Sequence, residues 1–544
     1  MNLWLTRWRG LGLALLPMAV LGWLLLAPVA RLGWAGLSGE FNAPGDWSIW
    51  QPWHDAYLRG RVLWSLAQAA ITCVLALLLG LPLAWVLARF EFAGRTVVLR
   101  LLMLPFVVPT LVAALGVLAL WGPRGLISSA LGINLQDTPW LLLYGNLFFN
   151  LCLVVRAGVD ALAQVNAHQL AAARSLGATR WRAFWRVEWP GIAPWLMASL
   201  CLVFLYCFSG FGLALVLGGQ RYATVEVEIY TLVAHELQLG QASVLALWTL
   251  LLTGGVALAY AMLEKRLAAP VRIAPVARVQ PCGWRQWLAV AGTLLVLFWV
   301  SALPIFAIFV KALSALYQGA NGIFDSEMWV ALGNTLRFSA AALVLATLLG
   351  VLHALALRTS LLWRALVFLP FVVSPVTVAF GLLLLYPSWT ASLPLLLLAY
   401  AVLAYPFVAK ALVAGLDSLP PPLTQVARTL GASPWRCFWR VSLPLLAPAM
   451  RRGMAFAAAT ALGEFAVTLF LSRPEWATLT TLIYQRLGRA GQTNLDAAMV
   501  LACVLMVLAL LAFLLIEWPT PQQGAARVPP PRSQPQAQWP AQHA

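Results

Sequence analysis

The feature that most constrains the fold is an internal repeat that lies between long apolar segments. Residues 171–190, AAARSLGATRWRAFWRVEWP, return at residues 425–444 as QVARTLGASPWRCFWRVSLP. Counted from Gly177 and Gly431, 9 of the 14 positions are identical. A repeat of this kind indicates that one structural unit occurs twice in the chain. The sequence therefore predicts two similar halves, each with one copy of this polar segment.

Each copy has the pattern of two short helices joined at a glycine. AAARSL and QVARTL are good helix formers. Gly177 and Gly431 stand where the end of a helix needs a left-handed residue, which glycine adopts without strain. Thr179 and Ser433 can then cap the following helix.

The second helix of each copy is predicted to have one aromatic face and one basic face. The aromatic residues recur at i, i+3 and i+4: Trp181, Phe184 and Trp185 in the first copy, and Trp435, Phe438 and Trp439 in the second. The basic residues form i, i+4 pairs: Arg182 with Arg186, and Arg436 with Arg440. Pro190 and Pro444 are expected to end these helices. Such a helix can lie at the membrane surface or dock on a partner, and two copies in one register favour docking.

The composition indicates a polytopic membrane protein. Hydrophobic residues make up 62% of the 544 residues and charged residues only 10%, far below the charged fraction of about 25% that is typical of soluble domains. The net charge of +17 would suit nucleic acid, but no soluble basic domain is evident to carry it. A surplus of basic residues in the cytoplasmic loops explains the charge better, so we expect membrane lipid and no nucleic acid as partners.

Twelve apolar segments are long enough to span a bilayer, which predicts an all-α protein of two parallel six-helix repeats. They lie near residues 11–30, 62–88, 99–121, 140–159, 192–217 and 243–263, and near 286–311, 331–357, 363–386, 393–412, 447–471 and 495–518. The expected divisions are a first half at 1–264, a cytoplasmic linker at 265–285, a second half at 286–518 and a disordered cytoplasmic tail at 519–544. The first apolar segment also resembles a cleavable signal peptide, but its length favours a retained helix.

With an even number of spans and the amino terminus inside, both repeat segments, the linker and the tail lie in the cytoplasm. About 25 of the 35 basic residues then face inward, as the positive-inside rule requires. Arg473, Arg486 and Arg489 are exceptions, because they fall outside. They either bind a partner or indicate a misplaced span.

The repeat segments resemble the signature loop of the inner-membrane permeases of bacterial ATP-binding-cassette importers, which reads E-A-A, three residues, G, nine residues and I-x-L-P. The matching positions are Ala171, Ala172, Ala173, Gly177, Val187 and Pro190, and again Gln425, Ala427, Gly431, Val441, Leu443 and Pro444. Both copies lack the leading glutamate. The resemblance implies the type I importer permease fold, with loops at about residues 160–190 and 414–444 that each dock on one of two cytosolic ATP-binding subunits. It also implies a periplasmic substrate-binding protein and a location in the bacterial inner membrane.

Two further segments indicate which members of this family the chain resembles most. GGQRYATVEVEIY and ALGEFAVTLF, in a chain with two fused halves, are most similar to thiamine-importing members of the family, and ferric-iron importers come next. The resemblance implies thiamine as substrate, with ferric iron as the alternative. A duplicated secondary transporter is the rival from another class, but an ion-driven carrier has no evident use for two matched cytoplasmic loops.

Catalytic and cofactor motifs are not evident in the sequence. A P-loop would need Gly-Lys-Ser/Thr, and none of the three lysines follows a glycine. We therefore expect no enzyme activity, cofactor or metal site, and ATP hydrolysis on a separate subunit. Glu464 aligns with Gly210, and an ionisable residue at membrane depth is a candidate for the substrate pathway. A structural ion pair or a place at the outer rim is an equal alternative.

Overall fold

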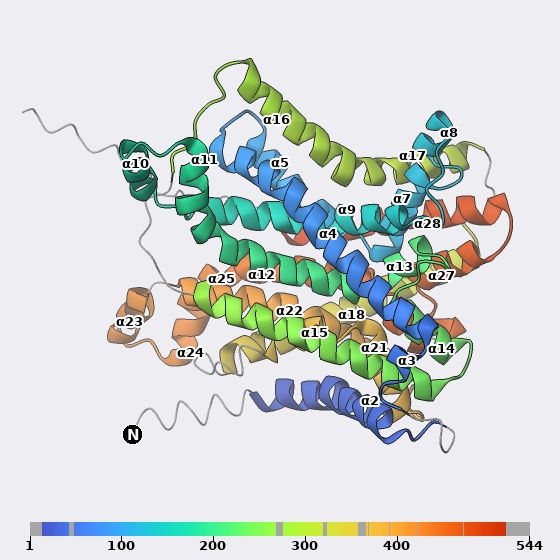
Figure 1. Cartoon of the computed structure of the whole chain (residues 1–544). Coiled ribbons are helices and arrows are strands. Elements are labelled where there is room, and N and C mark those ends of the chain that lie inside the picture. Colours follow the sequence, from blue (N-terminus) through green and yellow to red (C-terminus); the bar gives the residue numbers. More distant parts are fainter. Residues whose placement is uncertain are drawn as a thin grey trace, which may run out of the picture.

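The computed structural model describes residues 14–42, 48–267, 276–318, 324–356, 366–367, 369–390, 392–419, 421–471 and 473–517. Within these ranges the regular elements are helices, together with one isolated bridge between Phe90 and Val279. Long helices lie side by side along one direction (Figure 1). The all-α prediction is confirmed, whereas the predicted tail at 519–544 lies outside the described residues.

Ten helices in the described ranges are long and apolar enough to cross a membrane. They are Ala14–Ser38, Ala56–Arg89, Thr110–Leu131, Pro139–Leu162, Trp181–Phe208, Leu239–Leu263, Trp284–Tyr317, Ser326–Ala356, Leu393–Ser418 and Gln492–Ile516. Each overlaps one of the twelve predicted spans.

The other two predicted spans correspond to helices that are shorter or more polar. At 363–386 the described part holds α20 (Leu369–Val372) and α21 (Pro375–Leu385), and 11 residues of helix cover only about 16 Å. At 447–471 lies α25 (Leu443–Leu462), which has 20 residues but carries Arg451 and Arg452. The two arginines lower its hydropathy, although it follows the second repeat segment as a predicted span should.

The two halves repeat one order of helices. The first comprises η1 (Gly22–Leu26), α2 (Ala27–Ser38), α3 (Gln51–His54), α4 (Ala56–Arg89), α5 (Arg95–Leu101), α6 (Leu104–Val107), α7 (Thr110–Trp121), α8 (Leu126–Leu131), α9 (Pro139–Leu162), α10 (Ala167–Ser175), α11 (Arg180–Ala183), η2 (Phe184–Glu188), α12 (Trp189–Phe208), α13 (Gly212–Leu217), α14 (Val225–Ala234) and α15 (Leu239–Leu267). The second comprises α16 (Trp284–Leu297), η3 (Phe298–Ala302), α17 (Leu303–Tyr317), α18 (Ser326–Ala356), α20, α21, α22 (Leu393–Ser418), α23 (Pro421–Thr429), α24 (Pro434–Cys437), η4 (Phe438–Ser442), α25, α26 (Ala466–Leu471), η5 (Pro474–Trp476), α27 (Leu479–Gly488) and α28 (Gln492–Ile516).

The first helix of each half packs against the other half. Helix α2 contacts α21, and α17 contacts α7. Both contacts use a glycine, since a Cβ on Gly381 would lie 2.8 Å from the carbonyl oxygen of Pro28, and a Cβ on Gly116 would lie 2.8 Å from that of Pro304. Only a residue without a side chain lets the helix backbones approach so closely. The exchanged helices therefore join the two halves.

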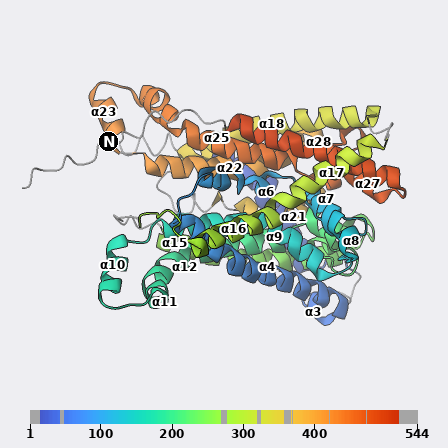
Figure 2. The same ribbon diagram turned by 90° about the horizontal axis from the view of Figure 1, so that it is seen from above.

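Both repeat segments project from the same end of the bundle. Helices α10 and α11 of the first and α23 and α24 of the second all lie at the left of Figure 1, and Figure 2 shows α10, α11 and α23 at the same end. We call this the loop end. Helices α8, α14 and α27 lie at the opposite end, which we call the far end (Figure 1). A common end is what parallel repeats with an even number of spans require.

The prediction that Pro190 and Pro444 end the second helix of each repeat segment is wrong. The helix continues from α11 through η2 into α12, and from α24 through η4 into α25. In the π-helical turns, Trp189 N–H donates to the Phe184 carbonyl and Leu443 N–H to that of Phe438. The wider turn accommodates the proline that follows, which has no N–H of its own to donate.

The predicted topology can be tested by labelling single cysteines in a chain without the native ones. A cysteine replacing the exposed Gln220, near the far end, should react with an impermeant reagent on intact cells. A cysteine replacing Ser175 at the loop end, and the exposed native Cys282 restored alone, should react only after the membrane is opened. Labelling of Ser175→Cys on intact cells would invert the topology.

Candidate functional site

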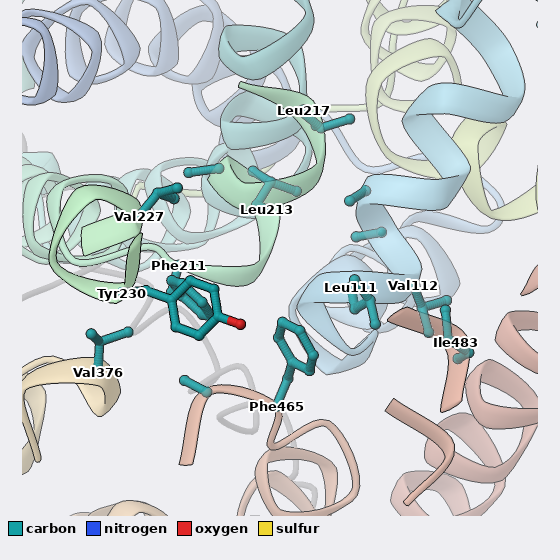
Figure 3. Packing of buried hydrophobic residues seen from close by; sticks show 14 of the residues in the cluster. Leu111, Val112, Phe211, Leu213, Leu217, Val227, Tyr230, Val376, Phe465 and Ile483 are labelled. Carbon is teal, nitrogen blue, oxygen red and sulfur yellow. The ribbon is translucent and has the colours of Figure 1, made fainter. Parts of the chain in front are cut away.

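The two halves meet at a pair of stacked rings from equivalent positions. Phe211 and Phe465 are separated by 254 residues, the same offset as Gly177 and Gly431. Their centroids lie 5.8 Å apart with an interplanar angle of 21°, and Figure 3 shows both residues within one apolar cluster, with Tyr230 in front of Phe211. Each follows the long helix that continues from its repeat segment, α12 in the first half and α25 in the second. The stack therefore marks the seam between the halves.

A tyrosine packs on each of these phenylalanines. The Tyr230 ring, from α14, lies 5.4 Å from Phe211, and the Tyr484 ring, from α27, lies 5.3 Å from Phe465. We call Phe211, Tyr230, Phe465 and Tyr484 the aromatic quartet. Apolar side chains that include Leu111, Val112, Val376 and Ile483 surround it, so it closes the space between the halves.

A second group of rings lies on the loop side of the quartet. Phe106, Tyr206, Phe371, Phe407 and Phe456 form it, with neighbouring centroids 5.2–6.5 Å apart. All five are only partly buried. Tyr206 and Phe456 precede the quartet on helices that run from the loop end, which places this group nearer that end. Ring faces of this kind can bind a flat or cationic molecule.

Glu464, the residue predicted for the pathway, lies directly beside the quartet and has a structural role there. Its side chain is buried, and Oε1 accepts a hydrogen bond of 3.0 Å from the backbone N–H of Val467 at the start of α26. Its carbonyl oxygen accepts from the Thr480 hydroxyl at 3.0 Å. A side chain does not fit at the equivalent Gly210, where a Cβ would lie 2.7 Å from the Tyr206 carbonyl oxygen. The carboxylate therefore occurs in one half only.

Glu226 is a functional candidate that our sequence analysis did not single out. It lies in α14, one helical turn before Tyr230, and its side chain is completely buried. Its Oε2 accepts a hydrogen bond of 2.6 Å from the hydroxyl of Ser374 in the second half. The sequence signal was a carboxylate in the otherwise apolar VEVEIY, but only the fold shows that Ser374 faces it.

The repeat segments have the predicted local structure. Gly177 and Gly431 have φ values of +79° and +81°, in the left-handed region. Thr179 Oγ1 accepts from Arg182 N–H and Ser433 Oγ from Arg436 N–H, both at 3.3 Å. The predicted site residues are exposed, except the half-buried Ala427: Ala171, Ala172, Gly177, Trp181, Arg182, Pro190, Gln425, Gly431, Trp435, Arg436 and Pro444.

Large apolar side chains on both repeat segments face solvent. Trp181 and Trp435 are each 70% exposed, and the equivalent leucines Leu176 and Leu430 are 88% and 82% exposed. Within each segment the tryptophans pack edge to face, with centroids 5.5 Å apart for Trp181 and Trp185. Exposed apolar groups beside a basic row are typical of a protein-binding surface.

The base of the first repeat segment is held by contacts that have no match in the described part of the second. Glu188 forms a 2.8 Å ion pair with Arg89 at the end of α4, and Ser442 occupies the equivalent position in the second half. Next to this pair, Val279 of the linker donates its N–H to the Arg89 carbonyl and accepts from Glu91 N–H, both at 3.0 Å. The linker is thus attached beside the first repeat segment.

The arginines that departed from the charge rule have partners at the far end. Arg486 contacts Asp325 at 2.5 Å and Glu327 at 3.1 Å, which ties α27 to the start of α18. The guanidinium carbon of Arg473 lies 5.7 Å from the centroid of the Trp476 ring. Arg473 and Arg486 therefore have partners at the far end, and the predicted spans need not be changed to explain these two arginines.

The chain matches the family model described as binding-protein-dependent transport system inner membrane component, over residues 76–269 and 284–518. The thiamine transport system permease protein of Escherichia coli K12 is 28% identical over 507 residues, which cover 88% of this chain and 92% of that protein. The protein of the same name from Brucella abortus 2308 is 27% identical over 93% of this chain and 94% of its own length. A putative 2-aminoethylphosphonate transport system permease protein of Salmonella typhimurium is 31% identical over 42% of this chain and 91% of its own length.

The closed quartet predicts a specific effect of removing one ring. Phe465→Ala should open a path between the halves and raise the passive efflux of a small monovalent cation from vesicles that contain the chain. Phe148→Ala is the control, because Phe148 is also fully buried but lies in α9 of the first half. Both substitutions remove similar packing, of about 3–5 kcal/mol. Equal efflux from the two variants would show that the quartet does not close a path.

Proposed function

The chain belongs to the family of binding-protein-dependent transport system inner membrane components, and on that premise we propose that it is the permease of an ATP-driven importer of thiamine. Two matched loops at one end, each with an exposed tryptophan and a basic row, carry the proposal of ATP-driven transport. Similarity to thiamine transport permeases across both halves supports the choice of substrate.

In the proposed assembly each repeat segment binds one copy of a cytosolic ATP-binding subunit. When the two subunits close on ATP, the segments move toward each other. The helix from Trp181 to Phe208 is continuous, and so is its counterpart that ends at Leu462. A displacement at the loop end is therefore transmitted along these helices to Phe211 and Phe465, which directly follow them.

The proposed route runs from the far end to the loop end. A periplasmic binding protein delivers substrate at the far end, and opening of the aromatic quartet admits it to the partly buried rings on the loop side. Thiamine carries a positive thiazolium ring, which the faces of these rings can stabilise. Glu464 beside the quartet would lower the cost of moving this cation through a medium of low dielectric constant. The proposed location is the bacterial inner membrane, with both termini in the cytoplasm.

The proposal is tested with the complete importer in vesicles, assembled from this chain, its ATP-binding subunit and its binding protein. We expect ATP-dependent uptake of labelled thiamine and none of ferric iron. Iron uptake without thiamine uptake would assign the second candidate substrate. Uptake that follows an ion gradient in vesicles holding the chain alone would instead indicate a secondary transporter.

The same vesicles test coupling through the left-handed glycines. Replacing both Gly177 and Gly431 with valine should uncouple ATP hydrolysis from uptake, because a β-branched residue is strained by about 1–2 kcal/mol in this backbone conformation. Replacing both with asparagine is the control, since asparagine tolerates that conformation and no neighbouring atom lies within 4 Å of an added Cβ at either glycine. Normal coupling in the valine variant would contradict docking through these loops.

A further inference from the structure

We infer that Glu226 is a second cation-binding carboxylate of the substrate pathway, which becomes available when the two halves separate at Ser374. This inference rests on the proposed function, because it requires a cationic substrate to pass between the halves. It concerns a residue of the first half, whereas Glu464 belongs to the second.

The position of Glu226 places a carboxylate at the moving seam. Its only described hydrogen bond, from the Ser374 hydroxyl, joins α14 of the first half to the start of α21 in the second. Ser374 also caps α21, because Oγ accepts from Thr377 N–H at 3.0 Å. Separation of the halves at this point breaks the contact with Glu226 and leaves the cap of α21 intact.

In the closed arrangement, the carboxylate of Glu226 can still accept a hydrogen bond or bind a cation. Its Oε1 is buried and has no hydrogen-bond partner among the described residues. A buried oxygen without a partner is unfavourable by about 1–3 kcal/mol. A cation that enters the seam supplies the missing interaction, and the flat face of Tyr230 lies one helical turn away. The site therefore suits a cationic heterocycle.

Neighbouring carboxylates already have partners. Glu228, two residues along α14, accepts a 3.0 Å hydrogen bond from the Tyr57 hydroxyl and lies 3.3 Å from Arg61 Nε. Glu464 is bound to the start of α26. The position equivalent to Glu226 in the second half is Thr480, whose hydroxyl donates to the Glu464 carbonyl. Of these three carboxylates, only Glu226 both lies at the seam and has a buried oxygen without a hydrogen-bond partner in the part of the chain that the structure describes.

The test uses Glu226→Gln in the complete importer reconstituted in vesicles. Glutamine has the same shape and can still accept from Ser374, so the complex should still assemble. Loss of the charge should lower thiamine uptake at subsaturating concentration by about tenfold. Glu228→Gln is the matched control on the same helix, and we expect less than about a twofold effect on uptake from it. Equal uptake by Glu226→Gln and the parent overturns the inference.

Ser374→Ala separates the charge from the contact between the halves. It removes the hydrogen bond to Glu226 and the cap of α21 but keeps the carboxylate, so the assembled variant should retain thiamine uptake. If both Ser374→Ala and Glu226→Gln lose uptake and raise basal ATP hydrolysis alike, Glu226 only holds the halves together and the inference is wrong. Should Glu226→Gln fail to assemble, retained uptake by Ser374→Ala still shows that the hydrogen bond between Glu226 and Ser374 is not required for transport, and loss of uptake by that variant overturns the inference. A parent importer that takes up no thiamine contradicts the proposed function and not the placement of Glu226.

Discussion

The stacking of Phe211 on Phe465 is the contact on which the rest of the structure depends. The two rings come from equivalent positions, so the seam between the halves coincides with the axis of the internal repeat. Tyr230 and Tyr484 complete a closed layer around it. Dispersion and apolar burial hold such a layer without directional bonds. It can therefore part and re-form without leaving many polar groups unsatisfied in a membrane.

Two other features of the structure matter for motion at the seam. The long helices that begin in the repeat segments end immediately before the two phenylalanines, and the π-helical turns keep them continuous past Pro190 and Pro444. The exchanged helices, with Gly381 close to Pro28 and Gly116 close to Pro304, join the halves through α21 and α7, which also supply side chains around the quartet. The molecule thus combines close backbone contacts between the halves with an aromatic contact that we propose separates during transport. Polar groups at the seam are few, and Glu226 with Ser374 is the clearest pair.

Much of this architecture could be predicted from the sequence because its signals are local or repeated. Glycine at 177 and 431 predicted the left-handed turns, and hydropathy located the spans. The continuation of the helix past Pro190 could not be predicted, because a π-helical turn has no sequence signature as strong as proline itself. The partners of Glu226 and Arg486 could not be predicted either, since each contact joins segments about 150 residues or more apart. Such pairs depend on how the helices pack and not on local pattern.

We propose that closure of the ATP-binding subunits opens the aromatic quartet. The most direct measurement is cross-linking between Phe211→Cys and Phe465→Cys in a chain without its native cysteines, assembled in the complete importer. We predict rapid cross-linking without nucleotide, and strongly reduced cross-linking when the importer is trapped in its ATP-bound state. Equal cross-linking in the two states would contradict the account, because the contact between the halves would then stay closed throughout the cycle.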